Sequence, residues 1–195
     1  MKSFLRFAVV FMLMLITTTC FAHKAIGYKT ERTMQDIQKI EDYFLNKYNL
    51  SLKNNVTVYV TKSHKEYVDT LVRCKVQNAK EIARTSYAVT SKTNTILIDG
   101  SMLSDKHFFF ILAHEMVHRY QFENIENPHA DYVMLEGLAD NIASKISGYY
   151  IDICDHRIPY EDLKSREQFF KSCNNRRNDT IEQIRYYTKD KELLN

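Results

Sequence analysis

The chain has 195 residues, 45% of them hydrophobic and 26% charged, with only four glycines and two prolines. This length suits one domain with a real hydrophobic core, and the composition excludes a chain that is mainly disordered or of low complexity. The formal net charge is +3. Proteins that bind nucleic acid usually carry a strongly basic face, so we expect no nucleic-acid partner.

The first 22 residues have the layout of a secretory signal peptide. Two basic residues precede an apolar run over residues 7–16, and the segment ends in the small residue Ala22. The run is shorter than the about 20 residues that a membrane-spanning helix needs. We therefore expect cleavage after Ala22 and a secreted or periplasmic protein of residues 23–195 with no stable membrane anchor. The alternatives are retention as a signal anchor and lipidation of Cys20.

The first part of the mature chain predicts a helix, a strand and a second helix. Apolar residues recur at helical spacing over residues 30–48. The β-branched alternation of NVTVYVT, residues 55–61, predicts a strand. Ser63 and Glu66 then form a capping box, which predicts a helix that runs toward Arg73.

A β-hairpin and a long helix follow. The segments SYAVT (86–90) and TILID (95–99) flank the polar turn SKTN, as two paired strands would. Ser104 is a suitable N-cap for a helix that continues to about Phe122.

Helices dominate the remainder of the chain. Asn127-Pro128 interrupts the helical pattern, which resumes over residues 131–147 and stops at Gly148. Further helical stretches are expected over about 160–172 and 179–193. This order predicts an α+β domain in which a short sheet is followed by a helical half.

An exported chain meets an oxidising environment, where disulfides persist. The mature chain holds three cysteines, at positions 74, 154 and 173. Cys154 and Cys173 are closest in sequence and flank a predicted helix, so we expect them to form a disulfide. Cys74 would then be a buried free thiol.

The stretch FFFILAHEMVHRYQFEN, residues 108–124, contains the pattern H-E-x-x-H within an apolar helix. His114 and His118 are four residues apart and share a helix face, so both imidazoles can reach one ion. Zinc suits this pair because it binds neutral imidazole nitrogens at short tetrahedral distances. Glu115, about 100° further round the helix, is placed to take a proton from a zinc-bound water. The alternative is a pair of structural histidines, but buried polar groups need partners, and a metal supplies one.

A catalytic zinc has three protein ligands and one open position. The H-E-x-x-H-x-x-G-x-x-H pattern of metzincins fails, because Gln121 and Asn124 stand at its last two positions. The next predicted helix offers Glu136, eighteen residues after His118, and Asp140 on the same face. Glu136 can bind the metal while Asp140 reaches the other nitrogen of a ligand histidine. The rival third ligands are Glu123, Glu126, His129 and Asp131.

H-E-x-x-H followed by E-x-x-x-D on the next helix resembles the gluzincins, the thermolysin-like and aminopeptidase-like zinc metallopeptidases. The segment LEGLAD, residues 135–140, is similar to the E-G-L-A-[DE] form of many of these enzymes. With the strand TILID included, the resemblance spans residues 95–148. It implies a small zincin-like domain with one Zn²⁺ per chain. The implied roles are zinc ligands for His114, His118 and Glu136, catalytic base for Glu115, and partner of His114 for Asp140.

The resemblance also implies an oxyanion donor and a strand that binds the substrate. The donor in gluzincins is a Tyr or His after the third ligand, and no spacing rule selects among Tyr149, Tyr150, His156 and Tyr160. In zincins an edge strand before the zinc helix binds the extended substrate, here NTILID or SYAVT.

The resulting hypothesis is an exported zinc metallopeptidase that hydrolyses a peptide or protein substrate, with Glu115 as general base. The alternative is a catalytically silent zinc-binding module that acts by binding another protein.

Overall fold

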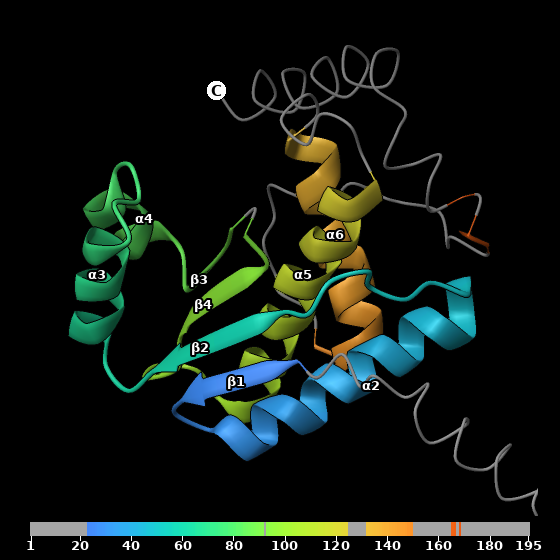
Figure 1. The fold of residues 1–195 in the computed structure, drawn as a ribbon, viewed down its shortest axis with the longest axis horizontal. Coiled ribbons are helices and arrows are strands. Elements are labelled where there is room, and N and C mark those ends of the chain that lie inside the picture. Colours follow the sequence, from blue (N-terminus) through green and yellow to red (C-terminus); the bar gives the residue numbers. More distant parts are fainter. Residues whose placement is uncertain (1–22, 92, 125–131, 150–164, 167, 169–195) are drawn as a thin grey trace, which may run out of the picture.

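The computed structural model describes residues 23–91, 93–124, 132–149, 165–166 and 168. Within these residues the chain forms a four-stranded sheet and five helices, a mixed α and β fold that agrees with the predicted α+β class (Figure 1). The signal segment, the predicted helix over 179–193, and both Cys154 and Cys173 lie outside the described residues. Of the predicted helix over 160–172, only residues 165–166 and 168 are described.

The sheet has the strand order β1-β2-β4-β3. Its strands are β1 (Lys24–Gly27), β2 (Thr57–Thr61), β3 (Ala88–Thr90) and β4 (Thr95–Asp99). The first three strands in this order are parallel, and β3 runs antiparallel to β4. Of the two candidate substrate strands, β3 is therefore an edge strand, whereas β4 lies inside the sheet and has no free edge, so that the prediction for NTILID is wrong.

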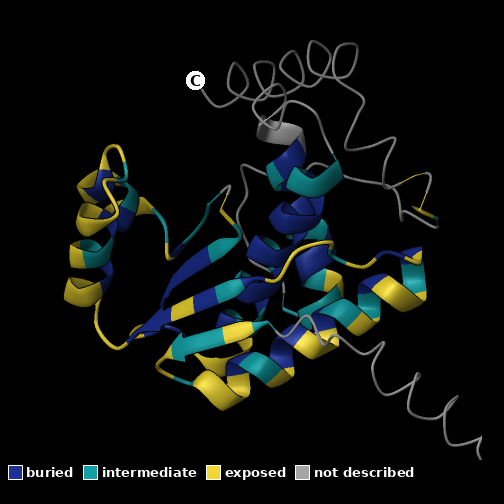
Figure 2. Ribbon diagram, viewed as in Figure 1, coloured by how far each residue is buried: buried dark blue, intermediate teal, exposed yellow. Residues whose placement is uncertain are grey.

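One face of the sheet carries the main core. Helices α2 (Thr30–Tyr48), α5 (Asp105–Asn124) and α6 (Tyr132–Ser147) lie on this side (Figures 1 and 2). Phe44 of α2 stacks on Tyr120 of α5 with 3.7 Å between the ring centroids. Helix α5 lies between the sheet and α6, which explains why it is apolar on most sides and buried along its length.

The opposite face is covered by α3 (His64–Arg73) and α4 (Ala79–Thr85). Tyr67 and Leu71 of α3 pack there against Leu97 of β4. The prediction that Cys74 is buried is wrong, because α3 ends at Arg73 and Cys74 is exposed at its C-cap, away from this small core.

Most of the predicted elements are present. Ser63 accepts a hydrogen bond from the Glu66 amide, as the capping box requires, and Ser104 accepts one from the His107 amide at the start of α5. The sequence pattern did not predict β1 and α4, because these elements have four and seven residues and are too short to show a clear period.

Candidate metal centre

The two histidines of H-E-x-x-H lie one above the other on α5 and converge on one point. Their Nε2 atoms are 3.0 Å apart, and the ring centroids are separated by 4.6 Å. His118 is buried and the His114 side chain is 13% exposed, so both rings are largely shielded from solvent. This geometry follows from the helical repeat and the burial of α5.

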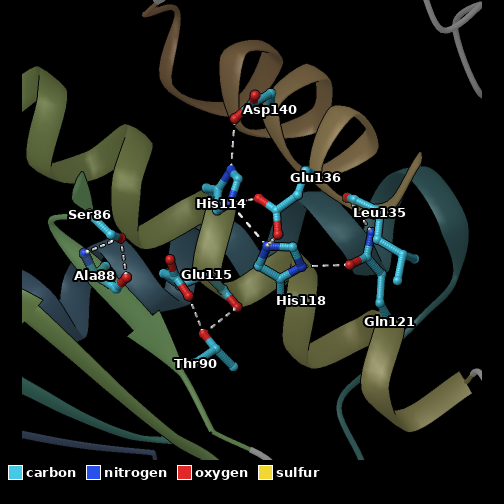
Figure 3. Close-up of polar contacts among 10 residues, drawn as sticks. All are labelled: Ser86, Ala88, Thr90, His114, Glu115, His118, Gln121, Leu135, Glu136 and Asp140. Carbon is cyan, nitrogen blue, oxygen red and sulfur yellow. Dashed lines mark hydrogen bonds and ion pairs between the residues drawn. The ribbon is translucent and has the colours of Figure 1, made fainter. Parts of the chain in front are cut away.

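Helix α6 supplies the third group. The Glu136 carboxylate lies 3.2 Å from His114 Nε2 and 3.3 Å from His118 Nε2, each through a different oxygen (Figure 3). One ligand atom from each of the three residues falls within 4.8 Å of the others, so the group could hold a metal ion. The Glu136 side chain is 31% exposed, which leaves this side of the cluster accessible to solvent.

The outer nitrogen of each imidazole is fixed by a separate side chain. His114 Nδ1 donates to Asp140 Oδ1 at 2.8 Å, and His118 Nδ1 donates to Gln121 Oε1 at 2.7 Å. The Gln121 amide group in turn donates to the backbone oxygen of Leu135 at 2.9 Å. With Nδ1 as donor in both rings, each neutral imidazole presents an Nε2 lone pair to the centre. Such an arrangement orients metal-binding histidines.

The cluster is electrostatically suited to a cation. Burial would lower the pKa of His114, but hydrogen bonds to Asp140 and Glu136 and the charge of Glu115 outweigh it and raise that pKa to about 10. Burial would likewise raise the pKa of Glu136, but its contacts with both histidines lower it. Both shifts have the same sense: carboxylates and histidines contact one another here, so the cluster favours positive charge, either as a proton on His114 or as a bound metal ion.

Glu115 points away from the three converging groups (Figure 3). It is 7% exposed, and its carboxylate accepts a hydrogen bond from the Thr90 hydroxyl at the end of β3. The hydroxyl also lies 3.3 Å from the Glu115 backbone oxygen. The carboxylate is therefore positioned between α5 and the edge strand, beside the cluster but not part of it.

Among the rival ligands and the candidate oxyanion donors, Glu123 and Tyr149 lie within the described residues. Glu123 is not part of the cluster, because its carboxylate accepts hydrogen bonds from the backbone amides of Lys53 and Asn54 and anchors the loop before β2. Tyr149 stacks on His107 with 5.2 Å between ring centroids. The other candidates, Glu126, His129, Asp131, Tyr150, His156 and Tyr160, lie outside the described residues.

The sequence pattern did not predict the roles of two residues at the site, Gln121 and Thr90. Gln121 follows His118 by three positions on the same helix face, a spacing that could have suggested the contact. Thr90 had no such signal, because its contact with Glu115 joins segments 25 residues apart.

Comparisons with protein-family profiles, with curated proteins and with solved structures found no match. Among the described residues, no helix combines the length and apolarity required to cross a membrane.

Proposed function

We propose that this chain is an exported zinc metallopeptidase of the gluzincin type, secreted or periplasmic, that acts on a peptide or protein substrate. The observation that carries the proposal is the convergence of His114, His118 and Glu136 beside a buried carboxylate, Glu115, that is not needed to hold the metal.

The donor set and its spacing support zinc. Two imidazole nitrogens and one carboxylate form a common catalytic zinc set that leaves one position open. A tetrahedral zinc with ligands at about 2.1 Å needs donor atoms about 3.4 Å apart. The two Nε2 atoms are 3.0 Å apart, one Glu136 oxygen lies 3.2 Å from His114 Nε2, and the other lies 3.3 Å from His118 Nε2. These distances are close to the spacing that zinc needs, and small movements of the side chains would adjust them.

The residues around the cluster could divide the work of peptide hydrolysis. Zinc, when bound, supplies a Lewis acid that polarises a carbonyl and acidifies water. Glu115 takes the proton of the attacking water and delivers it to the leaving amine. Asp140 and Gln121 keep both imidazoles in the tautomer that binds metal. The free side of β3 gives an extended substrate a strand to pair with, close to Glu115.

The test begins with protein produced from the full 195-residue sequence. Metal content by mass spectrometry should give about one zinc per chain, and Glu136→Ala should lose it. Hydrolysis of casein and of a fluorogenic peptide library should fall by about 10²- to 10⁴-fold in Glu115→Gln, which should keep its zinc. Glu31→Gln is the control, because Glu31 is an exposed residue in the first turn of α2.

The outcomes separate the hypotheses. A wild-type protein without zinc after reconstitution would refute the metal site. A zinc-loaded protein that cuts no substrate would instead favour the silent binding module. The intact mass of the purified protein would show whether the chain begins at His23, as cleavage after Ala22 requires.

A further inference from the structure

The outer edge of β3 offers very few backbone groups to a partner strand. Tyr87 accepts a hydrogen bond from the Asp99 amide at 2.8 Å, and the Ser91 amide donates to Thr95 at the same distance. In an antiparallel pair the bonded residues alternate, so positions 87, 89 and 91 face β4. The amide N–H and C=O of Ala88 and of Thr90 therefore point to the free side of the sheet.

The side chain of Ser86 already bonds the outward-facing backbone groups of Ala88. Its hydroxyl donates to the Ala88 backbone oxygen at 2.6 Å and accepts from the Ala88 amide at 3.3 Å (Figure 3). A hydroxyl can donate and accept at once, so this one side chain satisfies both groups that a partner strand would bond. Only Thr90 then keeps its outward-facing amide groups for another chain, and no hydrogen bond to them is found among the described residues.

A second place for the Ser86 hydroxyl lies close by. Tyr67 of α3 is fully buried, and its hydroxyl has no hydrogen-bond partner within the described part of the chain. Burial, together with the charges of Glu115 and Asp99, raises the pKa of Tyr67, and the neighbouring Ser86 side chain opposes part of that rise. The Ser86 side chain is therefore close enough to the Tyr67 hydroxyl to affect its pKa, but the two hydroxyls form no hydrogen bond in this structure.

We propose that Ser86 is an internal competitor for the substrate: its hydroxyl holds the Ala88 edge closed in the free protein, and a bound peptide displaces it toward the Tyr67 hydroxyl. This inference rests on the proposed peptidase function, and it adds a residue that controls substrate affinity without touching the reacting atoms. The competition weakens binding of the substrate and of the transition state equally. It therefore alters KM and leaves kcat unchanged.

The first experiment needs no activity. In the full chain, Ser86→Ala should make the Ala88 amide exchange with solvent about tenfold faster, measured by NMR hydrogen exchange. The Leu97 amide, on the strand paired with the other side of β3, should keep its rate. Thr85→Ala is the matched control, since it removes a neighbouring hydroxyl that bonds the α4 backbone instead. Unchanged exchange at Ala88 would overturn the inference whatever the protein does to peptides.

The second experiment measures affinity with the fluorogenic peptide that the wild-type protein cuts fastest. Ser86→Ala should lower KM about three- to tenfold with kcat unchanged, since a competing hydrogen bond is worth about that factor. Tyr67→Phe should raise KM, because the displaced hydroxyl loses its second partner. An unchanged KM in Ser86→Ala would overturn the competitor role, and an unchanged KM in Tyr67→Phe would overturn the movement toward Tyr67.

Failure of the proposed function would look different. It would appear as absence of cleavage by the wild type and by Ser86→Ala alike, and it would remove the inference with it. Failure of the inference alone would appear as normal cleavage with the wild-type KM in Ser86→Ala.

Discussion

At the scale of the residue, the two histidines of the cluster are held by different kinds of partner. His114 donates to a carboxylate, Asp140, and His118 donates to a neutral amide, Gln121. The Gln121 side chain is fully buried and is itself fixed by the Leu135 backbone. The hydrogen bonds of Gln121 to His118 and to Leu135 therefore link α5 to the backbone of α6, and they orient His118 without adding charge.

Gln121→Met tests this orienting role. The substitution keeps the length of the side chain but removes both hydrogen bonds, so the His118 ring loses its fixed tautomer. We expect the affinity for zinc to fall about 10- to 100-fold, measured by competition with a chromophoric chelator. Gln38→Met is the control, because Gln38 donates to the nearby Asp42 on an exposed face of α2. Equal affinities of the Gln121 variant and the wild type would show that His118 needs no such partner.

Thr90 has a comparable role for Glu115. Thr90→Val keeps the β-branched shape but removes the hydroxyl that donates to the carboxylate. We expect kcat to fall about tenfold while zinc content stays at the wild-type value, because the base loses its fixed position but the ligands do not. Thr90→Ser, which retains the hydroxyl, should recover most of the rate. A loss of zinc in Thr90→Val would contradict the separation of base and ligands.

At the scale of the element, the position of β3 depends on a buried arginine. Arg119 is 2% exposed, and it donates to the Ser91 backbone oxygen at 2.9 Å and to the Asn94 side chain. Both acceptors belong to the turn of the β3–β4 hairpin, where Asn94 adopts a left-handed conformation with φ of 59°. Burial lowers the pKa of Arg119, and Nε has no partner among the described residues. The chain thus buries a cation to fix the hairpin against α5.

Arg119→Met is expected to destabilise the fold. The substitution leaves the two acceptors of the turn without their donor, which should lower the free energy of unfolding by about 2 kcal/mol, measured by urea denaturation. Arg84→Met is the control, since Arg84 lies exposed on α4 and should change stability by less than about 0.5 kcal/mol. Similar losses in the two variants would show that the hairpin does not depend on Arg119.

At the scale of the whole molecule, the cluster lies between two helices that pack against each other, α5 and α6. The three residues that could hold a metal ion come from α5, packed on the sheet, and from α6, which packs on the other side of α5. A metal ion held by both helices binds the folded chain and has no such site in the unfolded chain. Metal binding should therefore stabilise the fold as a whole.

Zinc at about 1,000 times its Kd should add about 4 kcal/mol to the free energy of unfolding. For a chain of this size the melting temperature should rise by roughly 10 °C, and a chelator should reverse the rise. Calorimetry with and without chelator provides the measurement. Glu136→Ala should show almost no response to zinc, and an equal response in that variant would exclude Glu136 as a ligand.

The amino-acid sequence by itself determined those features that depend on neighbours along the chain. The helical repeat places His114 and His118 on one face, the capping residues start α3 and α5, and the polar turn SKTN gives the hairpin. Each of these features is a local consequence of backbone geometry, so the residue pattern and spacing were enough to predict it. The pairing of Glu136 with Asp140 on α6 was also visible, because both belong to one helix face.

The tertiary structure decided which distant groups meet. It brought Glu136 to the histidines while Glu123 anchored a loop, and it placed Thr90 on Glu115 and Gln121 on His118. It also made β3, and not β4, the edge strand beside the site. These contacts depend on how helices and strands pack across the core, and a contact between separate elements leaves no periodic signal in the sequence.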